Sequence, residues 1–191
     1  LLLSGASGTG KSSFFRALSG LWPLGEGEIH FPENAKVFTL PQRAYFPLGS
    51  LRQAIAYPTP VEDADDEAIR AALRAVGLSH LTHRLDEEAD WPAVLAGGEQ
   101  QRAAFARALL AAPDILLLDE PVAALEATDA DALFALLAER LPRAIIVTIG
   151  RATALAHLHD SVIELKRGTI ASIESVASIE SAAPRPVVVR A

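Results

Sequence analysis

The sequence contains no cysteine, which excludes disulfide bridges and thiolate-based zinc or redox sites anywhere along its 191 residues. It also lacks an apolar run of the ~20 residues that a membrane-spanning helix requires. No charged stretch followed by an apolar one opens the chain, so the sequence predicts no signal peptide. Positive charge is in deficit, with 17 Lys and Arg against 24 Asp and Glu, and this balance argues against nucleic acid as a partner.

Apolar material, in contrast, is sufficient for one compact domain, since 50% of the residues are hydrophobic. Short apolar runs bounded by turn residues alternate with stretches of helical periodicity. That pattern favours an α/β fold with a mainly parallel sheet flanked by helices. Strands are expected at 1–3, 37–40, 115–118 and 144–149, with a hairpin at 162–165 and 169–173, and helices at 11–19, 62–76, 99–110 and 133–141.

The two ends of the chain read differently from its middle. Leu1 is not a methionine and already lies in a strand-like run, so we expect a fragment whose N-terminal strands are missing. From residue 171 the sequence repeats Ile-Glu-Ser and then carries two prolines. We therefore expect an ordered domain at 1–170 and a loosely ordered tail at 171–191.

The first apolar run leads into a loop that fits G-x-x-x-x-G-K-[ST], between an expected strand and an expected helix. Glycines let the backbone curl around phosphate oxygens, and N–H groups at the helix start bind anions. Lys11 is expected to reach the β- and γ-phosphates, and the Ser12 hydroxyl to ligate Mg²⁺. The alternative, a Gly- and Ser-rich turn with an unrelated lysine, is disfavoured by this setting. The nucleotide-binding set expected from the loop is Gly5, Ala6, Ser7, Gly8, Thr9, Gly10, Lys11, Ser12 and Ser13.

Two carboxylates, Asp119 and Glu120, end the apolar run that begins at Ile115. Ligands of open α/β sheets bind where the strands end. Asp119 is expected to bind Mg²⁺ through a water, and Glu120 to polarise the attacking water. Many strands end in an acid, so the pattern gains its weight from the phosphate loop about a hundred residues upstream.

A segment between these two motifs, Leu95-Ala96-Gly97-Gly98-Glu99-Gln100-Gln101-Arg102, resembles the LSGGQ-type signature of ABC ATPases. Gln42 is similar to the glutamine of the family's Q-loop, and residues 120–126 resemble its D-loop. The resemblance extends to about Leu165. Short segments such as Gly20-Leu21-Trp22-Pro23, Pro41-Gln42-Arg43 and Asp90-Trp91 are similar to those of one branch of the family. That branch contains bacterial peptide and vitamin transporters with fused permease and ATPase, and peroxisomal fatty-acyl half-transporters.

The resemblance implies a P-loop NTPase fold with a helical subdomain at about 50–112. It also implies a head-to-tail homodimer that sandwiches two ATPs, with the signature residues Ala96, Gly97, Gly98 and Glu99 facing the partner's nucleotide. Catalysis is expected from Glu120, Lys11 and Gln42, and Mg²⁺ binding from Ser12, Gln42 and Asp119. A transmembrane permease, fused upstream and docked near the 42–51 segment, would place the domain at the cytoplasmic face of a bacterial inner membrane. Tyr45 and Phe46 are either exposed docking residues or ordinary packing.

Three positions depart from the family pattern. Ala96 replaces the signature serine and removes a hydroxyl that could bond the γ-phosphate, a bond worth ~1.5–3 kcal/mol. Glu126 replaces the D-loop aspartate. Arg151 stands where the family has a histidine, and an arginine cannot exchange a proton near neutral pH. His157 and His159 lie beyond that position and are expected to serve surface or packing roles. ATP binding with slowed hydrolysis is the expected result.

Two other readings remain open. One is a degenerate domain that binds ATP as a structural or regulatory clamp with little hydrolysis. The other is a soluble ABC protein that acts on DNA or ribosomes, which the acidic balance of the chain disfavours. A plain kinase or GTPase leaves Gln42 and the signature segment unexplained.

Overall fold

The computed structural model describes residues 1–22, 26–175 and 188–190. The chain divides into two compact units. The first consists of Leu1–Thr39, Pro113–Pro121 and Arg143–Ala191, and the second of Leu40–Ala112 and Val122–Pro142.

The elements of the first unit are mostly strands. They are β1 (Leu2–Ser4), α1 (Lys11–Leu18), β2 (Glu28–His30), most of β3 (Val37–Leu40), β6 (Ile115–Asp119), β7 (Ile145–Ile149), α7 (Ala152–Leu155), β8 (Ser161–Lys166), β9 (Thr169–Ser175) and β10 (Val188–Arg190), with a 3-10 turn at Ala156–Leu158. The second unit is mostly helical. It contains β4 (Gly49–Ser50), α2 (Leu51–Ala56), α3 (Asp66–Ala75), β5 (Glu88–Ala89), α4 (Trp91–Val94), α5 (Gly97–Ala111) and α6 (Ala127–Arg140), with 3-10 turns at Val61–Asp63 and Ser79–Leu81.

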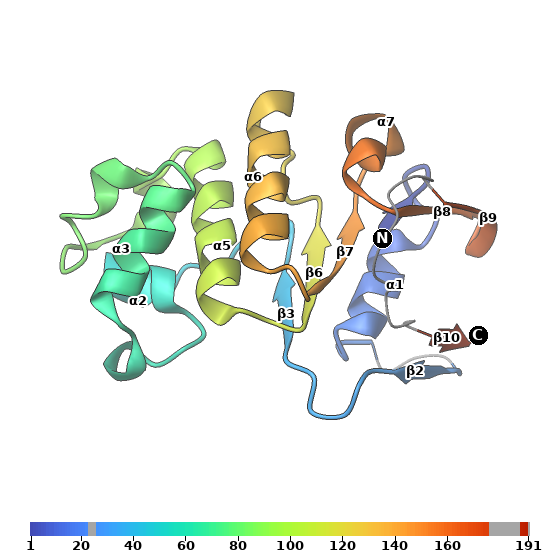
Figure 1. Cartoon of the computed structure of the whole chain (residues 1–191), viewed down its shortest axis with the longest axis horizontal. Coiled ribbons are helices and arrows are strands. Elements are labelled where there is room, and N and C mark those ends of the chain that lie inside the picture. Colours follow the sequence, from blue (N-terminus) through green and yellow to red (C-terminus); the bar gives the residue numbers. More distant parts are fainter. Residues whose placement is uncertain (23–25, 176–187, 191) are drawn as a thin grey trace. The chain divides into compact units, whose positions relative to one another are not determined.

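A six-stranded sheet runs in the order β3-β6-β7-β1-β8-β9. The β6–β7, β7–β1 and β1–β8 pairs are parallel, and the β8–β9 pair is antiparallel. Figure 1 shows β6 and β7 side by side. Because these parallel strands share one direction, the residues that follow β1, β6, β7 and β8 meet at the same edge of the sheet. The expected α/β fold with a mainly parallel sheet is confirmed.

The core of the first unit explains why α1 lies where it does. Phe15 and Leu18 of α1 are buried against apolar side chains from four parallel strands. Burying a side chain of this size contributes roughly 1.5–3 kcal/mol, so this contact fixes the helix that follows the phosphate loop. The buried residues of the cluster are Leu3, Phe15, Leu18, Ile115, Leu117, Val147, Ile149 and Leu165.

Helix α5 is the centre of the second unit, and Figure 1 shows α2 and α3 close beside it. Residues 103–108 are all buried, and α5 also contacts α6 through an edge-to-face pair of Phe105 and Phe134, whose ring centroids lie 6.0 Å apart. The helix ends at Ala111, and its C-cap residue Ala112, whose φ is +42°, stands immediately before Pro113. Within the described part of the chain, no helix is long and apolar enough to cross a bilayer.

Two predicted helix starts were wrong. Helix α3 begins at Asp66 and not at residue 62, because Asp65 has an extended backbone and its side chain accepts the Glu67 N–H. Helix α6 begins at Ala127, six residues before the expected start. Its first turns are largely exposed, so they carry no apolar periodicity that sequence analysis could detect.

The segment expected to form a tail from residue 171 begins inside β9. Ile173 pairs with Ile163 and Ser175 with Ser161, so the antiparallel ladder with β8 extends to Ser175. Residues 176–187 and 191 lie outside the described residues. The backbone of Val188–Arg190 forms β10, which pairs with β2 in an antiparallel ladder.

Candidate functional site

The phosphate loop connects β1 to α1 and depends on glycine at particular positions. Gly8 and Gly10 have φ values of +78° and +97°, in the left-handed region that favours glycine. A Cβ on Gly5 would lie 2.4 Å from the Leu165 carbonyl oxygen, so the backbones of the loop and β8 touch there. The stretch Ala6–Gly8 is exposed. The loop therefore presents its backbone to solvent at the carboxyl edge of the sheet.

The Lys11 ammonium group bends back over this loop. Its Nζ donates to the Gly5 and Ala6 carbonyl oxygens at 2.7 and 2.8 Å. The Thr9 hydroxyl donates to the same Ala6 oxygen at 2.8 Å and braces the turn from inside. Gly10 provides no side-chain cap for α1, which leaves the first N–H groups of that helix available to an anion.

Asp119 is the last residue of β6 and Glu120 follows it, two strands from β1 and at the same edge of the sheet. Burial raises the pKa of the Asp119 carboxyl above its ordinary value; repulsion by Glu120 adds to the rise, while Arg16 and Lys11 oppose it. Glu120 is exposed, has a φ of +47°, and donates its N–H to the Ile149 oxygen at 2.9 Å. The structure thus brings the phosphate loop and both acids together.

The oxygen donors at this edge fit Mg²⁺ delivered with phosphates. No group of three or more His, Cys, Asp and Glu side chains able to hold a metal occurs among the described residues. Mg²⁺ commonly takes one or two protein oxygens, several waters and substrate phosphates, which suits the Ser12 hydroxyl and the Asp119 carboxylate. A cation would also relieve the repulsion between Asp119 and Glu120.

The signature segment opens α5 in the second unit. Ala96 is the N-cap residue and has no side-chain oxygen to accept a helix N–H. The Glu99 carboxylate accepts the Ala96 N–H at 2.9 Å, and its other oxygen lies 3.0 Å from His80 Nε2. Gln100 donates to the Pro92 and Leu95 oxygens at 2.9 and 3.0 Å, which ties the segment to α4. Gly97 is exposed at the helix start.

The D-loop packs directly against this helix start. A Cβ on Gly98 would lie 3.2 Å from Leu125 Cδ2, and one on Gly97 would lie 3.6 Å from Ala124 Cβ. The Gln101 amide oxygen accepts the Ala124 N–H at 2.9 Å. Small residues at positions 97 and 98 therefore let the two segments meet. Glu126 is exposed at the N-cap position of α6, and its side chain forms no cap.

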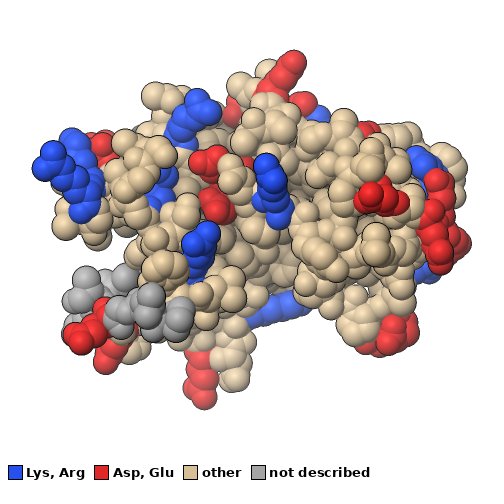
Figure 2. Space-filling model, turned by 180° about the vertical axis from the view of Figure 1, so that it is seen from behind, with Lys and Arg blue, Asp and Glu red and all other residues tan. Residues whose placement is uncertain are grey.

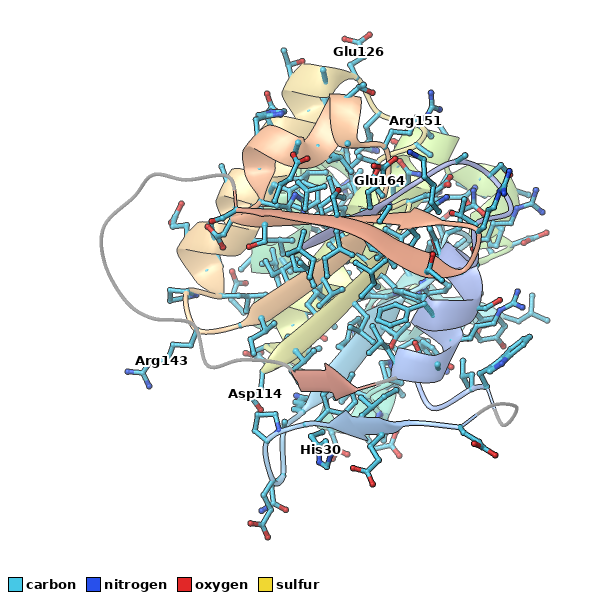
Figure 3. The ribbon with its side chains drawn as sticks, turned by 90° about the vertical axis from the view of Figure 1, so that its right-hand side faces the viewer. His30, Asp114, Glu126, Arg143, Arg151 and Glu164 are labelled. Carbon is cyan, nitrogen blue, oxygen red and sulfur yellow. The ribbon has the colours of Figure 1, made fainter. Side chains whose placement is uncertain are left out.

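The segment after β7 carries Arg151, which is exposed and occupies the N-cap position of α7 (Figure 3). His157 is exposed, whereas His159 is buried, with Nε2 2.8 Å from the Thr148 hydroxyl and Nδ1 2.8 Å from the Leu155 oxygen. Burial is the main cause that lowers the pKa of His159 to about 4. Of the two histidines, His159 is the one with a structural role.

The Q-loop segment belongs to the second unit, where Gln42 is exposed. Tyr45 is 61% exposed, but Phe46 is buried beneath the Arg107 guanidinium, whose Cζ lies 4.4 Å from the ring centroid. Arg107 is 4% exposed and donates to the Ala54 and Tyr45 oxygens at 2.8 and 2.6 Å. Burial lowers the pKa of Arg107 to about 10. Sequence analysis missed this arginine, although the alanines on both sides of it in α5 were a visible signal.

Charge is mixed over the face of the molecule seen in Figure 2, where Lys and Arg side chains are interspersed with Asp and Glu.

Comparison with known proteins gives consistent matches. The family model described as "ABC transporter" matches residues 1–123. A Haemophilus influenzae protein described as an uncharacterized ABC transporter ATP-binding protein is 37% identical over 166 residues, which cover 87% of this chain and 28% of that protein. ATP-binding cassette sub-family D member 1 of Drosophila melanogaster is 44% identical over 131 residues, or 63% of this chain and 18% of that protein.

Among solved structures, a bacterial Atm1-family ABC exporter with ATP bound matches with a TM-score of 0.81 and 25% identity. The match covers 91% of this chain and 33% of the exporter chain. The chain spans 28% and 18% of the two curated relatives and 33% of the exporter chain.

Proposed function

This chain belongs to the ABC transporter family, and from that membership we propose that it binds and hydrolyses ATP as the motor domain of a membrane transporter. The resemblance drawn from its motifs is confirmed by the family match. One observation carries the proposal: the phosphate loop with Lys11 lies at the same sheet edge as Asp119 and Glu120. That edge combines an anion cradle, a cation and two carboxylates.

Each residue of this edge has a role that its chemistry supports. The loop N–H groups and Lys11 bind and neutralise the phosphate tail of ATP. Ser12 and Asp119 would hold Mg²⁺ through hard oxygen ligands, and the family resemblance adds Gln42 as a third. The ion would supply charge neutralisation at the γ-phosphate. Glu120 orients and polarises the attacking water as general base.

The proposal extends to a second copy of the domain. The start of α5 is formed by Ala96, Gly97, Gly98 and Glu99, of which Ala96 and Gly97 are exposed. It offers helix N–H groups and the positive end of a helix dipole to the nucleotide of a partner. A head-to-tail homodimer uses both surfaces in each site. A permease domain fused to this one would place it on the cytoplasmic face of a membrane, in the bacterial inner membrane for a bacterial source.

Ala96, Glu126 and Arg151 lead us to propose slow turnover. The first two weaken closure around the γ-phosphate, and the third supplies positive charge without a titratable proton. The clamp function, in which ATP is bound and scarcely hydrolysed, is the second candidate for the same reason.

Phosphate release and ATP binding by the full chain distinguish these functions. Glu120→Gln is expected to keep ATP binding and to lower phosphate release by at least ~100-fold, because it removes the general base. Lys11→Ala is expected to lose ATP binding, and Glu174→Gln, an exposed change on β9, is the matched control. Unchanged phosphate release in Glu120→Gln would contradict the motor and favour the clamp. Normal family turnover that is insensitive to Arg151→Ala would contradict the slow rate.

A further inference from the structure

The turn between β8 and β9 lies against the phosphate loop. The Gly168 N–H donates to the Thr9 oxygen at 3.2 Å, and a Cβ on Gly10 would lie 3.9 Å from the Gly168 Cα. Three residues before Gly168, the Leu165 oxygen approaches Gly5. The loop therefore has this hairpin as a direct neighbour, with backbone against backbone.

The turn is basic and its side chains face solvent. Lys166 and Arg167 are both exposed, and neither forms an ion pair with another residue in the described part of the chain. Their backbone is hydrogen-bonded to the loop through the adjacent Gly168. Both charged side chains are thus attached directly before Gly168, the residue whose backbone contacts the loop.

The backbone of Arg167 adds a second argument. Lys166 pairs with Thr169, so Arg167 and Gly168 form a two-residue turn, with φ values of +51° and +79°. Asparagine or glycine is favoured at both positions of such a turn, and a side chain such as arginine costs roughly 1 kcal/mol there. Strain of this kind at an exposed position next to a ligand loop is typical of a functional side chain.

We infer that Lys166 and Arg167 form a second basic wall of the nucleotide site and contact the phosphates of the ATP bound in the loop. The inference rests on the proposed function and adds two binding residues to it. Lys11 neutralises the phosphates from within the loop, and the hairpin turn does so from its flank. The wall acts through charge, so it favours ATP over ADP and ADP over AMP.

Equilibrium titrations of the full chain with ATP and AMP test this wall. The variant combines Lys166→Gln with Arg167→Asn, since asparagine tolerates the left-handed turn and keeps the hairpin folded. ATP affinity is expected to fall about fivefold at low salt and less at high salt, with AMP affinity nearly unchanged. Arg167→Lys alone, which keeps the positive charge, is expected to retain most of the ATP affinity. Arg143→Gln is the matched control, because Arg143 precedes β7 at the opposite edge of the sheet (Figure 3).

The outcomes separate the inference from the function. One outcome is that the unchanged chain binds ATP, that Lys11→Ala abolishes this binding, and that the double variant binds ATP within twofold of the unchanged chain. In that case the basic wall is wrong and the motor proposal stands. If the unchanged chain does not bind ATP at all, the proposed function itself fails. Equal losses of ATP and AMP affinity would also overturn the wall, because they would indicate a distorted loop and not a lost charge.

Discussion

His159 Nε2 lies 2.8 Å from the Thr148 hydroxyl, so a residue just before β8 is joined to the middle of β7. The Leu155 oxygen, 2.8 Å from Nδ1, can only accept a hydrogen bond, so Nδ1 carries the proton. Nε2 then accepts a hydrogen bond from the Thr148 hydroxyl. The neutral imidazole therefore satisfies both partners, with Nδ1 as the donor and Nε2 as the acceptor. This hydrogen bond joins the two ends of the segment between β7 and β8, which carries Arg151.

The first prediction concerns the pH dependence of stability. The pKa of His159 is about 4 in the fold, below the ordinary value of 6.5, so the unfolded chain takes up the proton first as pH falls. Its contribution to stability is complete above pH 6.5 and is lost as pH falls from there towards 4. In urea unfolding, His159→Gln is expected to flatten this part of the pH profile, with an effect on the order of 2 kcal/mol. An equally steep profile in His159→Gln and its exposed control His157→Gln would contradict the assignment.

The second prediction concerns Arg107, whose Nη2 has no hydrogen-bond partner in the described part of the chain. Arg107→Met keeps much of the side-chain volume but leaves the buried Ala54 oxygen and the partly buried Tyr45 oxygen without their donors. The free energy of unfolding is expected to fall by about 3 kcal/mol. Arg74→Met, on the exposed face of α3, is expected to cost less than ~0.5 kcal/mol. Denaturant unfolding of both variants measures the difference, and similar losses would count against a special role for Arg107.

The third prediction compares two glycines of the phosphate loop. Gly5→Ala places a methyl group 2.4 Å from a backbone oxygen, which cannot move without shifting β8. We expect a loss of at least ~2 kcal/mol in unfolding free energy together with loss of ATP binding. Gly8→Ala meets open space and pays only the strain of its φ of +78°, about 1 kcal/mol. Thermal unfolding ranks the two, and the reverse order would contradict the close approach of Leu165.

The fourth prediction concerns the missing cap of α5. Ala96→Ser supplies a hydroxyl at an N-cap whose backbone is already extended, with φ −61° and ψ 157°. Stability is expected to rise by about 1 kcal/mol, because Glu99 already completes the other half of a capping box. Ala93→Ser in α4 serves as the control, with no gain expected. Under the proposed dimer, Ala96→Ser also lengthens the lifetime of the ATP-bound dimer, which light scattering or sedimentation measures.

The sequence was sufficient wherever function depends on contiguous residues. The phosphate loop, the acids after β6 and the mainly parallel character of the sheet follow from glycine spacing and from apolar runs with turns between them. Helix α2 was not predicted, because it has only six residues, although the Ser50 and Gln53 side chains form both halves of a capping box at its start.

Contacts between distant residues were not predictable. Arg107 meets the Ala54 oxygen 53 positions away, and Gly168 reaches Thr9 across most of the chain. Such pairs are decided by how β8 pairs with β1 and how α5 packs, not by local preference. The burial of His159 and the exposure of His157 are decided in the same way, because two positions on one short segment face opposite environments.

The backbone conformation of Glu120 lowers the stability of the fold at the residue that we propose as the general base. A left-handed φ and a neighbouring carboxylate both disfavour glutamate at this position, and asparagine would remove both penalties. Selection for a robust fold alone would therefore discard this residue, and a stabilising-mutation screen should recover its replacement. A chain that keeps Glu120 is therefore less stable to heat than it could be, in return for ATP hydrolysis. Enrichment of Glu120→Asn in such a screen would identify a more stable, inactive protein that differs by one substitution.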